Sequence, residues 1–172
     1  MKHNLSIQFK SILLRPLEIG DALVLRELRN RNARFFFSDS QISETQQLQW
    51  YQNYLAKEGD YMFAVVPAED PGCFWGAIGI YGIDSAESIA ESGRVIVDRE
   101  KTGKKGVGTL AIQAAARLTF TQLGIEKLIA RILPDNIPSI RAHEKAGYLL
   151  AGQDQQSLVY ELSKNSISEV II

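Results

Sequence analysis

One basic, glycine-containing stretch is the part of the sequence best suited to bind a charged ligand. Residues 99–105, Arg-Glu-Lys-Thr-Gly-Lys-Lys, are strongly basic and lead into Gly106, Val107 and Gly108. Glycines at the start of a helix let backbone N–H groups approach a phosphate closely, and the helix dipole favours an anion there by about 0.3–1 kcal/mol. The stretch predicts a pyrophosphate-binding loop, with a solvated basic turn as the alternative.

Two common phosphate-binding motifs fit this loop poorly. Gly103 and Gly108 have the outer spacing of a Walker loop, but Thr109 follows where that motif needs lysine, so a nucleoside triphosphate is disfavoured. Gly106 and Gly108, with Ala111, match the dinucleotide fingerprint. That motif requires its glycines directly after the first strand of a βαβ array, whereas charged residues intervene here. A nicotinamide enzyme is therefore the weakest interpretation.

The composition is that of an ordinary globular chain without a strong overall charge. The 172 residues are 45% hydrophobic and 23% charged, which predicts one domain over residues 1–172 with a core of its own. With 19 Lys and Arg against 20 Asp and Glu, the net charge is −1. We therefore expect no nucleic-acid partner and no attraction to an anionic membrane surface.

The cysteine and histidine content limits the possible metal chemistry. Cys73 is the only cysteine, and with only His3 and His143 the chain cannot assemble a Cys/His metal cluster. No apolar run approaches the roughly 18 residues of a membrane span, and the first residues are polar. We expect no metal, no membrane partner and a cytoplasmic location.

Hydrophobic periodicity and turn residues predict the element order βααβββαβαββ around one mixed sheet, an α/β (α+β) fold. Strands are expected at 12–14, 61–66, 75–83, 89–97, 127–133, 148–151 and 158–162, and helices after Gly20, from Ser43 to near Gly59, over 107–123 and over 138–146. Residues 163–172 are expected as a tail whose apolar end, 170–172, either pairs across a dimer or is disordered.

The glycine loop resembles the acetyl-CoA signature of the GNAT superfamily of acetyl-CoA-dependent N-acetyltransferases, Arg/Gln-x-x-Gly-x-Gly/Ala between a strand and a helix. Residues 103–108 match it, except that Gly103 stands where arginine or glutamine is usual. This departure removes a side-chain contact to the pyrophosphate but keeps the backbone amides. Residues 136–148 resemble a second family segment, Asn-x-x-Ala/Ser-Ile-…-Glu-Lys-x-Gly-Phe/Tyr.

The resemblance implies a single domain with a mixed, mostly antiparallel sheet, a splayed parallel strand pair at 91–97 and 127–133, and helices on both faces. Acetyl-CoA would be the co-substrate and would lie in the gap, without a metal. Backbone N–H groups near Ile96 or Val97 would stabilise the oxyanion. The implied acetyl-CoA-binding residues are Val95, Ile96, Val97, Gly103, Lys104, Lys105, Gly106, Val107, Gly108, Thr109, Asn136 and Ser139.

A base is needed because an alkylamine has a pKa of about 10.4 and must be neutral to attack. Glu91 begins the splayed strand and resembles the glutamate that many family members use to accept the proton through water. The alternatives are that Glu91 is a surface carboxylate or the partner of Arg94. Asp84 and Glu87 are the other candidate carboxylates.

The residue aligned with the tyrosine that protonates the leaving thiolate in many relatives is His143. Ser139 lies four residues earlier, on the same helix face, and histidine can donate a proton near neutral pH. The alternative is a partly exposed histidine with no role. Asn136 either caps this helix or binds the pantetheine arm, or does both.

Four arginines within nine residues, followed by three phenylalanines, suggest an acceptor that is anionic and carries a ring. A solvated arginine face over core phenylalanines is the alternative. This region, together with the helix segment from Ile42-Ser43 to Gln49-Trp50, resembles family members that acetylate nucleotide-linked amino sugars, and also those that acetylate ribosomal-protein N-termini. We expect a small-molecule amine acceptor and a monomer or homodimer, with a degenerate acetyl-CoA sensor as the competing interpretation. The residues are Arg26, Arg29, Arg31, Arg34, Phe35, Phe36 and Phe37.

Overall fold

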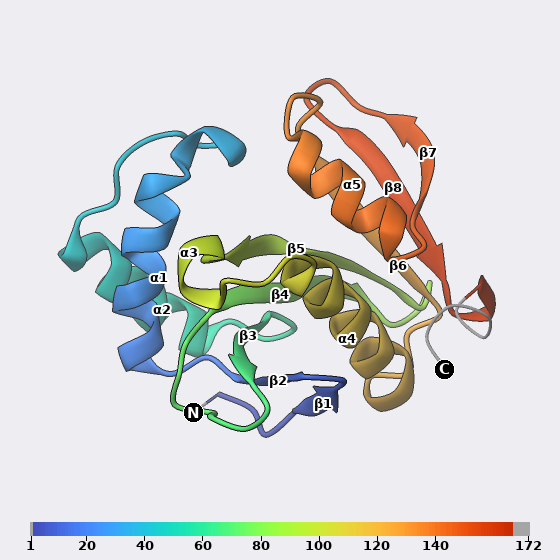
Figure 1. Ribbon diagram of the computed structural model, residues 1–172. Coiled ribbons are helices and arrows are strands. Elements are labelled where there is room, and N and C mark those ends of the chain that lie inside the picture. The colour runs from blue at the N-terminus through green and yellow to red at the C-terminus, as the bar shows by residue number, and fades with distance from the viewer. Residues whose placement is uncertain (1, 167–172) are drawn as a thin grey trace.

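The strands form one eight-stranded sheet in the order β1-β2-β3-β4-β5-β6-β8-β7, in which β5–β6 is the one parallel pair within the described residues (Figure 1). The computed structural model describes residues 2–166. The strands are β1 (Ile7–Phe9), β2 (Ile12–Pro16), β3 (Tyr61–Pro67), β4 (Gly76–Asp84), β5 (Ile89–Val97), β6 (Lys127–Ile132), β7 (Leu149–Gln153) and β8 (Leu158–Ser163). The helices are α1 (Ile19–Arg31), α2 (Glu44–Ala56), α3 (Arg99–Thr102), α4 (Val107–Gln122) and α5 (Ile137–Lys145), with 3-10 turns η1 (Ala33–Phe35) and η2 (Lys164–Ser166).

Helices cover both faces of the sheet because the central strands are apolar on both sides. In β3, Phe63 and Val65 belong to the core cluster that contains α4, whereas Met62 and Ala64 belong to the cluster that contains α1 and α2. Successive residues of a strand point to opposite faces, so an unbroken apolar run serves two helix layers at once. The expected mixed, mostly antiparallel domain with helices on both faces is confirmed.

The parallel pairing between β5 and β6 is short. Residues 89–91 of β5 pair with 127–129 of β6, and the rest of β5, residues 92–97, has no partner on β6. β6 continues instead along β8. Figure 1 shows β6, β8 and β7 with α5 diverging from the part of the sheet that contains β1 to β5. The expected splayed pair is present.

Short elements are the ones that periodicity does not predict. β1 has three residues, too few to show a period of two, and α3 is a single turn begun by Asp98, whose carboxylate accepts the N–H groups of Glu100 and Lys101 at 3.1 Å each. Where a cap motif is explicit, the prediction is confirmed: Gln46 N–H donates to Ser43 Oγ at 3.2 Å at the start of α2. Residues 170–172, expected either to pair across a dimer or to be disordered, lie outside the described residues.

We expect Gly76→Ala to destabilise the protein, because a Cβ at this position would lie 2.1 Å from the Ile96 carbonyl oxygen of β5. The obstacle is backbone and cannot rotate away, so we expect a loss of about 1–3 kcal/mol in the free energy of unfolding. Gly152→Ala in β7 is the matched control, since an added Cβ there meets no heavy atom within 4 Å. Urea unfolding of both variants measures the difference, and wild-type stability of Gly76→Ala would contradict this close approach.

Candidate active site

The glycine loop between β5 and α4 leaves its backbone open to a ligand. Gly103 ends α3 with a φ of 56°, and Gly106 begins α4 with a φ of 89°, both in the left-handed region. Gly106 has no side chain to cap the helix, so the first N–H groups of α4 keep their donors free for a ligand. A Cβ added at Gly103, Gly106 or Gly108 meets no heavy atom within 4 Å. The loop therefore has the room and the donors that a pyrophosphate requires.

Asp98 ties this loop to α1. Arg31 donates to its carboxylate at 2.9 Å, and the same carboxylate caps α3. Desolvation alone would raise the pKa of Asp98, but the hydrogen bonds from Lys101 N–H and Arg31 outweigh it and lower the pKa. Asp98 therefore fixes the start of the loop through both Arg31 and the cap of α3. Further along the loop, the Lys104 ammonium lies 5.8 Å from the Trp75 ring centroid.

β5 presents one edge of its backbone on the side from which β6 departs. The Ile96 carbonyl oxygen lies toward β4, and Asp98 N–H donates to Trp75 O at 2.8 Å. Alternate residues of a strand direct their backbone groups to opposite sides, so those of Val95 and Val97 face away from β4. Between the two expected oxyanion donors, this orientation favours Val97 over Ile96.

Glu91 is the last residue of β5 that pairs with β6, so it lies where the two strands part. Tyr81 Oη donates to Glu91 Oε1 at 2.9 Å, and Arg131 of β6 forms an ion pair with Oε2. Burial, together with the charge of Glu91, raises the pKa of Tyr81 well above its usual value, which keeps its hydroxyl a donor. The Glu91 side chain is 22% exposed, so water still reaches it.

Arg94 is not the partner of Glu91. It donates to Asp60 Oδ1 at 2.7 Å and stacks on Tyr81, with 4.1 Å from its guanidinium carbon to the ring centroid. Arg131, which does pair with Glu91, also lies 3.6 Å from the carboxylate of Asp154 in the β7–β8 turn. The other candidate carboxylates are Asp84, which ends β4, and Glu87 in the β4–β5 turn, whose N–H donates to Asp84 Oδ1 at 3.1 Å.

His143 is buried in the core, with 2% of its surface exposed. Its Nδ1 lies 2.9 Å from the Ser139 carbonyl oxygen, and because a carbonyl only accepts, Nδ1 carries the proton. Burial lowers the pKa of His143 to about 4. The ring is therefore neutral at pH 7, and its one N–H is committed to the backbone. This weighs against the expected role as a proton donor, and we leave His143 out of the proposed proton transfers.

Two hydroxyls meet at the base of the gap. Ser92, the first residue of β5 beyond the paired segment, has its Oγ 2.7 Å from Tyr148 Oη, and both side chains are buried. The ring of His143 packs edge-on against Tyr148 with 5.1 Å between the centroids. Ser92 and Tyr148 thus bridge β5 to the chain between α5 and β7, where the sheet opens.

Asn136 caps α5, as one of its two expected roles requires. Its Oδ1 accepts the Ser139 N–H at 3.2 Å, and its Nδ2 donates to Phe35 O at 3.2 Å. The side chain therefore joins the start of α5 to the loop after α1. The other expected role, a contact to the pantetheine arm, stays a prediction, as does that of Ser139.

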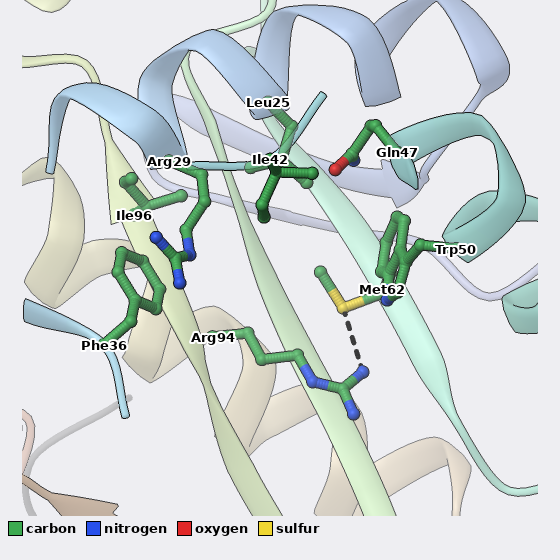
Figure 2. A pocket seen from close by; sticks show the side chains of 9 residues that line it. All are labelled: Leu25, Arg29, Phe36, Ile42, Gln47, Trp50, Met62, Arg94 and Ile96. Carbon is green, nitrogen blue, oxygen red and sulfur yellow. Dashed lines mark hydrogen bonds between the residues drawn. The ribbon is translucent and has the colours of Figure 1, made fainter. Parts of the chain in front are cut away.

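A cavity of about 200 Å³ lies on the face of the sheet covered by α1 and α2 (Figure 2). β5 contributes Arg94 and Ile96 to its wall, so the cavity adjoins the stretch of β5 that has left β6. Its lining residues are Leu25, Arg29, Phe36, Ile42, Gln47, Trp50, Met62, Arg94 and Ile96. None of them is acidic. Of the four arginines between residues 26 and 34, Arg29 is the one that lines this cavity.

Sequence reasoning did not find several residues of this site. Arg131 and Tyr81 lie 40 and 10 residues from Glu91, and Met62 comes from a strand whose apolar pattern predicts only a core position. No local motif marks such contacts. Among the described residues, no group of three or more His, Cys, Asp or Glu side chains is placed to hold a metal ion, and none of the helices there is long and apolar enough to cross a membrane.

The open strand edge and the glycine loop at its end are the arrangement that the resemblance to acetyl-CoA-dependent transferases implies. A family model described as the acetyltransferase (GNAT) domain matches residues 11–149. The chain therefore belongs to the GNAT family of acetyltransferases, and it is an N-acetyltransferase that uses acetyl-CoA.

Individual relatives agree with this family. The chain is 28% identical over 148 residues to the probable N-acetyltransferase YjcK of Bacillus subtilis, with 81% of each chain covered. Its fold is similar to that of FdhC, described as a nucleotide-linked sugar GNAT, with a TM-score of 0.83, 20% identity and coverage of 97% and 94%. It is also similar to spermidine N-acetyltransferase from Vibrio cholerae in complex with coenzyme A and spermine, with a TM-score of 0.77, 21% identity and coverage of 91% and 97%.

We expect Gly108→Val to weaken binding of coenzyme A by at least about tenfold. A Cβ added at Gly108 meets no protein atom within 4 Å, so we expect the larger side chain to obstruct mainly a ligand that lies against the loop. Gly20→Val is the matched control, because Gly20 is likewise the second residue of a helix and an added Cβ there meets nothing within 4 Å. Lys104→Ala should cost a smaller, salt-sensitive part of the affinity. Isothermal titration with coenzyme A gives the three values, and normal binding by Gly108→Val would remove the loop from the site.

His143 should make the protein less stable in acid. Its pKa is about 4 when folded and about 6.5 when unfolded, so below pH 6.5 the unfolded state binds more protons. Its contribution is complete above pH 6.5 and is lost as the pH falls toward 4, which amounts to about 2 kcal/mol between pH 7 and pH 5. His143→Leu should show a smaller fall between these two pH values in urea unfolding. An equal fall in both proteins would contradict a neutral, buried imidazole.

Proposed function

We propose that the protein moves the acetyl group of acetyl-CoA to a primary amine of a small molecule, by direct attack, and that this acceptor is a nucleotide-linked amino sugar. One observation carries the proposal. The cavity that adjoins the open stretch of β5 is lined by two arginines and two aromatic rings and by no carboxylate. Arginines bind phosphate and stack on rings, which suits a nucleotide. One relative in fold is described as a nucleotide-linked sugar GNAT, which lends support.

The donor would be held mainly by backbone. The N–H groups of the loop and of the first turn of α4 would bind the pyrophosphate, with Lys104 and Lys105 adding charge. The edge of β5 that faces away from β4, including Val95 and Val97, would pair with the amides of the pantetheine arm. Acetyl-CoA supplies an acetyl thioester, and Val97 N–H would stabilise the negative charge that develops on its carbonyl oxygen.

Glu91 would take the proton that the amine loses, through water. The new bond joins the amine nitrogen to the acetyl carbon, the carbon–sulfur bond breaks, and the electron pair leaves with sulfur as the thiolate. Tyr81 and Arg131 hold the carboxylate at the point where the strands part. Coenzyme A thiolate is a fairly good leaving group, so this scheme needs no side-chain acid.

The proposal is tested by measuring release of the coenzyme A thiol from acetyl-CoA in the presence of each of several acceptor amines. We expect release above the rate of hydrolysis with a uridine-diphosphate amino sugar, and little release with spermidine, because a polycation gains nothing from a cavity lined by arginine. A peptide with the N-terminus of a ribosomal protein is the third arm. The strongest release with that peptide would move the assignment to protein N-termini. Binding of acetyl-CoA without release in any arm would indicate a sensor.

Glu91→Gln should lower kcat/KM by about 10²-fold near pH 7 and recover as the pH approaches the amine pKa of about 10.4, because solution then supplies the neutral amine. Tyr81→Phe keeps the carboxylate and should lower kcat/KM much less, without changing the shape of the pH profile. Glu87→Gln, in the β4–β5 turn, is the control and should behave as wild type. A pH–rate profile of Glu91→Gln parallel to that of wild type would assign the proton to bulk water or another carboxylate.

A further inference from the structure

The structure separates the four arginines near residue 30 by what each one contacts. Arg31 pairs with Asp98 at 2.9 Å. Arg34 is exposed and stacks on the ring of Phe35, 4.6 Å from its centroid. Arg26 donates to Ile42 O at 3.4 Å and does not line the cavity. Arg29 alone among the four is part of the cavity wall.

Arg29 brings an unpaired donor to this wall. Its Nη2 donates to Ser38 O, and its guanidinium carbon lies 4.4 Å from the Phe36 ring centroid. Its Nη1 is buried and has no hydrogen-bond partner among the described residues. In Figure 2 the side chain reaches from α1 into the space between Phe36 and Met62. The guanidinium is thus fixed by two contacts, and its Nη1 remains available to donate to a ligand.

The neighbouring charges do not neutralise this guanidinium. Arg94, the other arginine of the wall, gives its Nη1 to Asp60, a carboxylate whose side chain is 5% exposed. Asp39, whose charge opposes the effect of burial, is an exposed loop residue and makes no ion pair with Arg29. Burial lowers the pKa of Arg29, which means that its charge is held at a cost. An unpaired buried donor is unfavourable, the more so when it is charged, and a bound anion would remove this cost.

The size of the cavity limits what accompanies the anion. About 200 Å³ is less than the roughly 300–1,000 Å³ of sites that enclose a drug-sized ligand. A nucleotide-linked sugar would therefore place only one part inside and extend beyond the cavity, which has room for one ring or a short apolar group with a charged substituent. Trp50, Met62 and Leu25 supply an apolar wall for such a group.

We propose that Arg29 is the specificity-determining residue of the acceptor site, and that it binds a single anionic group, a phosphate or a carboxylate, on the non-reacting end of the amine substrate. The inference deepens the proposed function and rests on it. It assigns the anion contact to Arg29 rather than to Arg26, Arg31 or Arg34. It also predicts that an amine without a negative charge is a poor acceptor even when its apolar part is unchanged.

Two matched pairs of amines test the assignment and separate its two anion sources. Glucosamine 6-phosphate and glucosamine differ in a phosphate, and phenylalanine and 2-phenylethylamine differ in a carboxylate. Wild type should prefer the anionic member of at least one pair by 10-fold or more in kcat/KM. Arg29→Gln should lower kcat/KM for that member 10- to 100-fold and change the neutral member less than threefold. Arg29→Lys should recover part of the preference, and Arg34→Gln is the matched control and should keep all of it.

Binding of the same amines, measured by calorimetry in the presence of coenzyme A, keeps this test apart from that of the proposed function. Anion-selective binding that disappears in Arg29→Gln supports the inference even when no acetyl is transferred, and the proposed function fails alone. An equal loss for both members of a pair in Arg29→Gln would reduce Arg29 to a structural residue. The absence of any anion preference in wild type, in rate and in binding, would overturn the inference.

Discussion

Parallel pairing between β5 and β6 stops after three residues, and the site depends on where it stops. The stop has a local cause in β5, where Arg94 takes a left-handed φ of 54° and the register with β4 shifts between Gly79 and Ala77. An irregular strand cannot continue a regular ladder on its other edge. On the far side, Tyr148 meets Ser92 at the first unpaired position. The unpaired edge of β5 is therefore fixed by the fold itself, through the left-handed backbone of Arg94 and the buried Ser92–Tyr148 hydroxyl pair.

Ion pairs distribute charge around this opening. Three arginines form ion pairs there: Arg131 with Glu91, Arg94 with Asp60, and Arg31 with Asp98. Each pair joins elements that are far apart in the sequence. Each pair fixes a different boundary of the site: the junction of the strands, the cavity wall and the loop before α4. A buried or half-buried pair contributes more to geometry than to stability, because desolvation offsets most of the attraction. Among the arginines that line the cavity, Arg94 is therefore paired, whereas Nη1 of Arg29 has no partner among the described residues.

The features that the sequence predicts are local ones, set by residues that are neighbours in the chain. The glycine loop, the Ser43 cap and the Asn136 cap are local patterns, and the long strands and helices follow from periodicity. The partners of Glu91 come from β4 and β6, so no window of sequence contains them. His143 illustrates the same limit. Its spacing to Ser139 is evident from the sequence, but its burial against Tyr148 depends on how α5 lies on the sheet, and burial sets its pKa.

The two substrates would use β5 in two different ways. The donor would contact the backbone edge near Val97 and the glycine loop, which depend little on side-chain identity. The proposed acceptor cavity takes its wall from side chains of α1, α2 and the segment between them, with Met62 from β3 and Arg94 and Ile96 from β5. Substitutions in that wall would therefore change the acceptor without disturbing the donor edge.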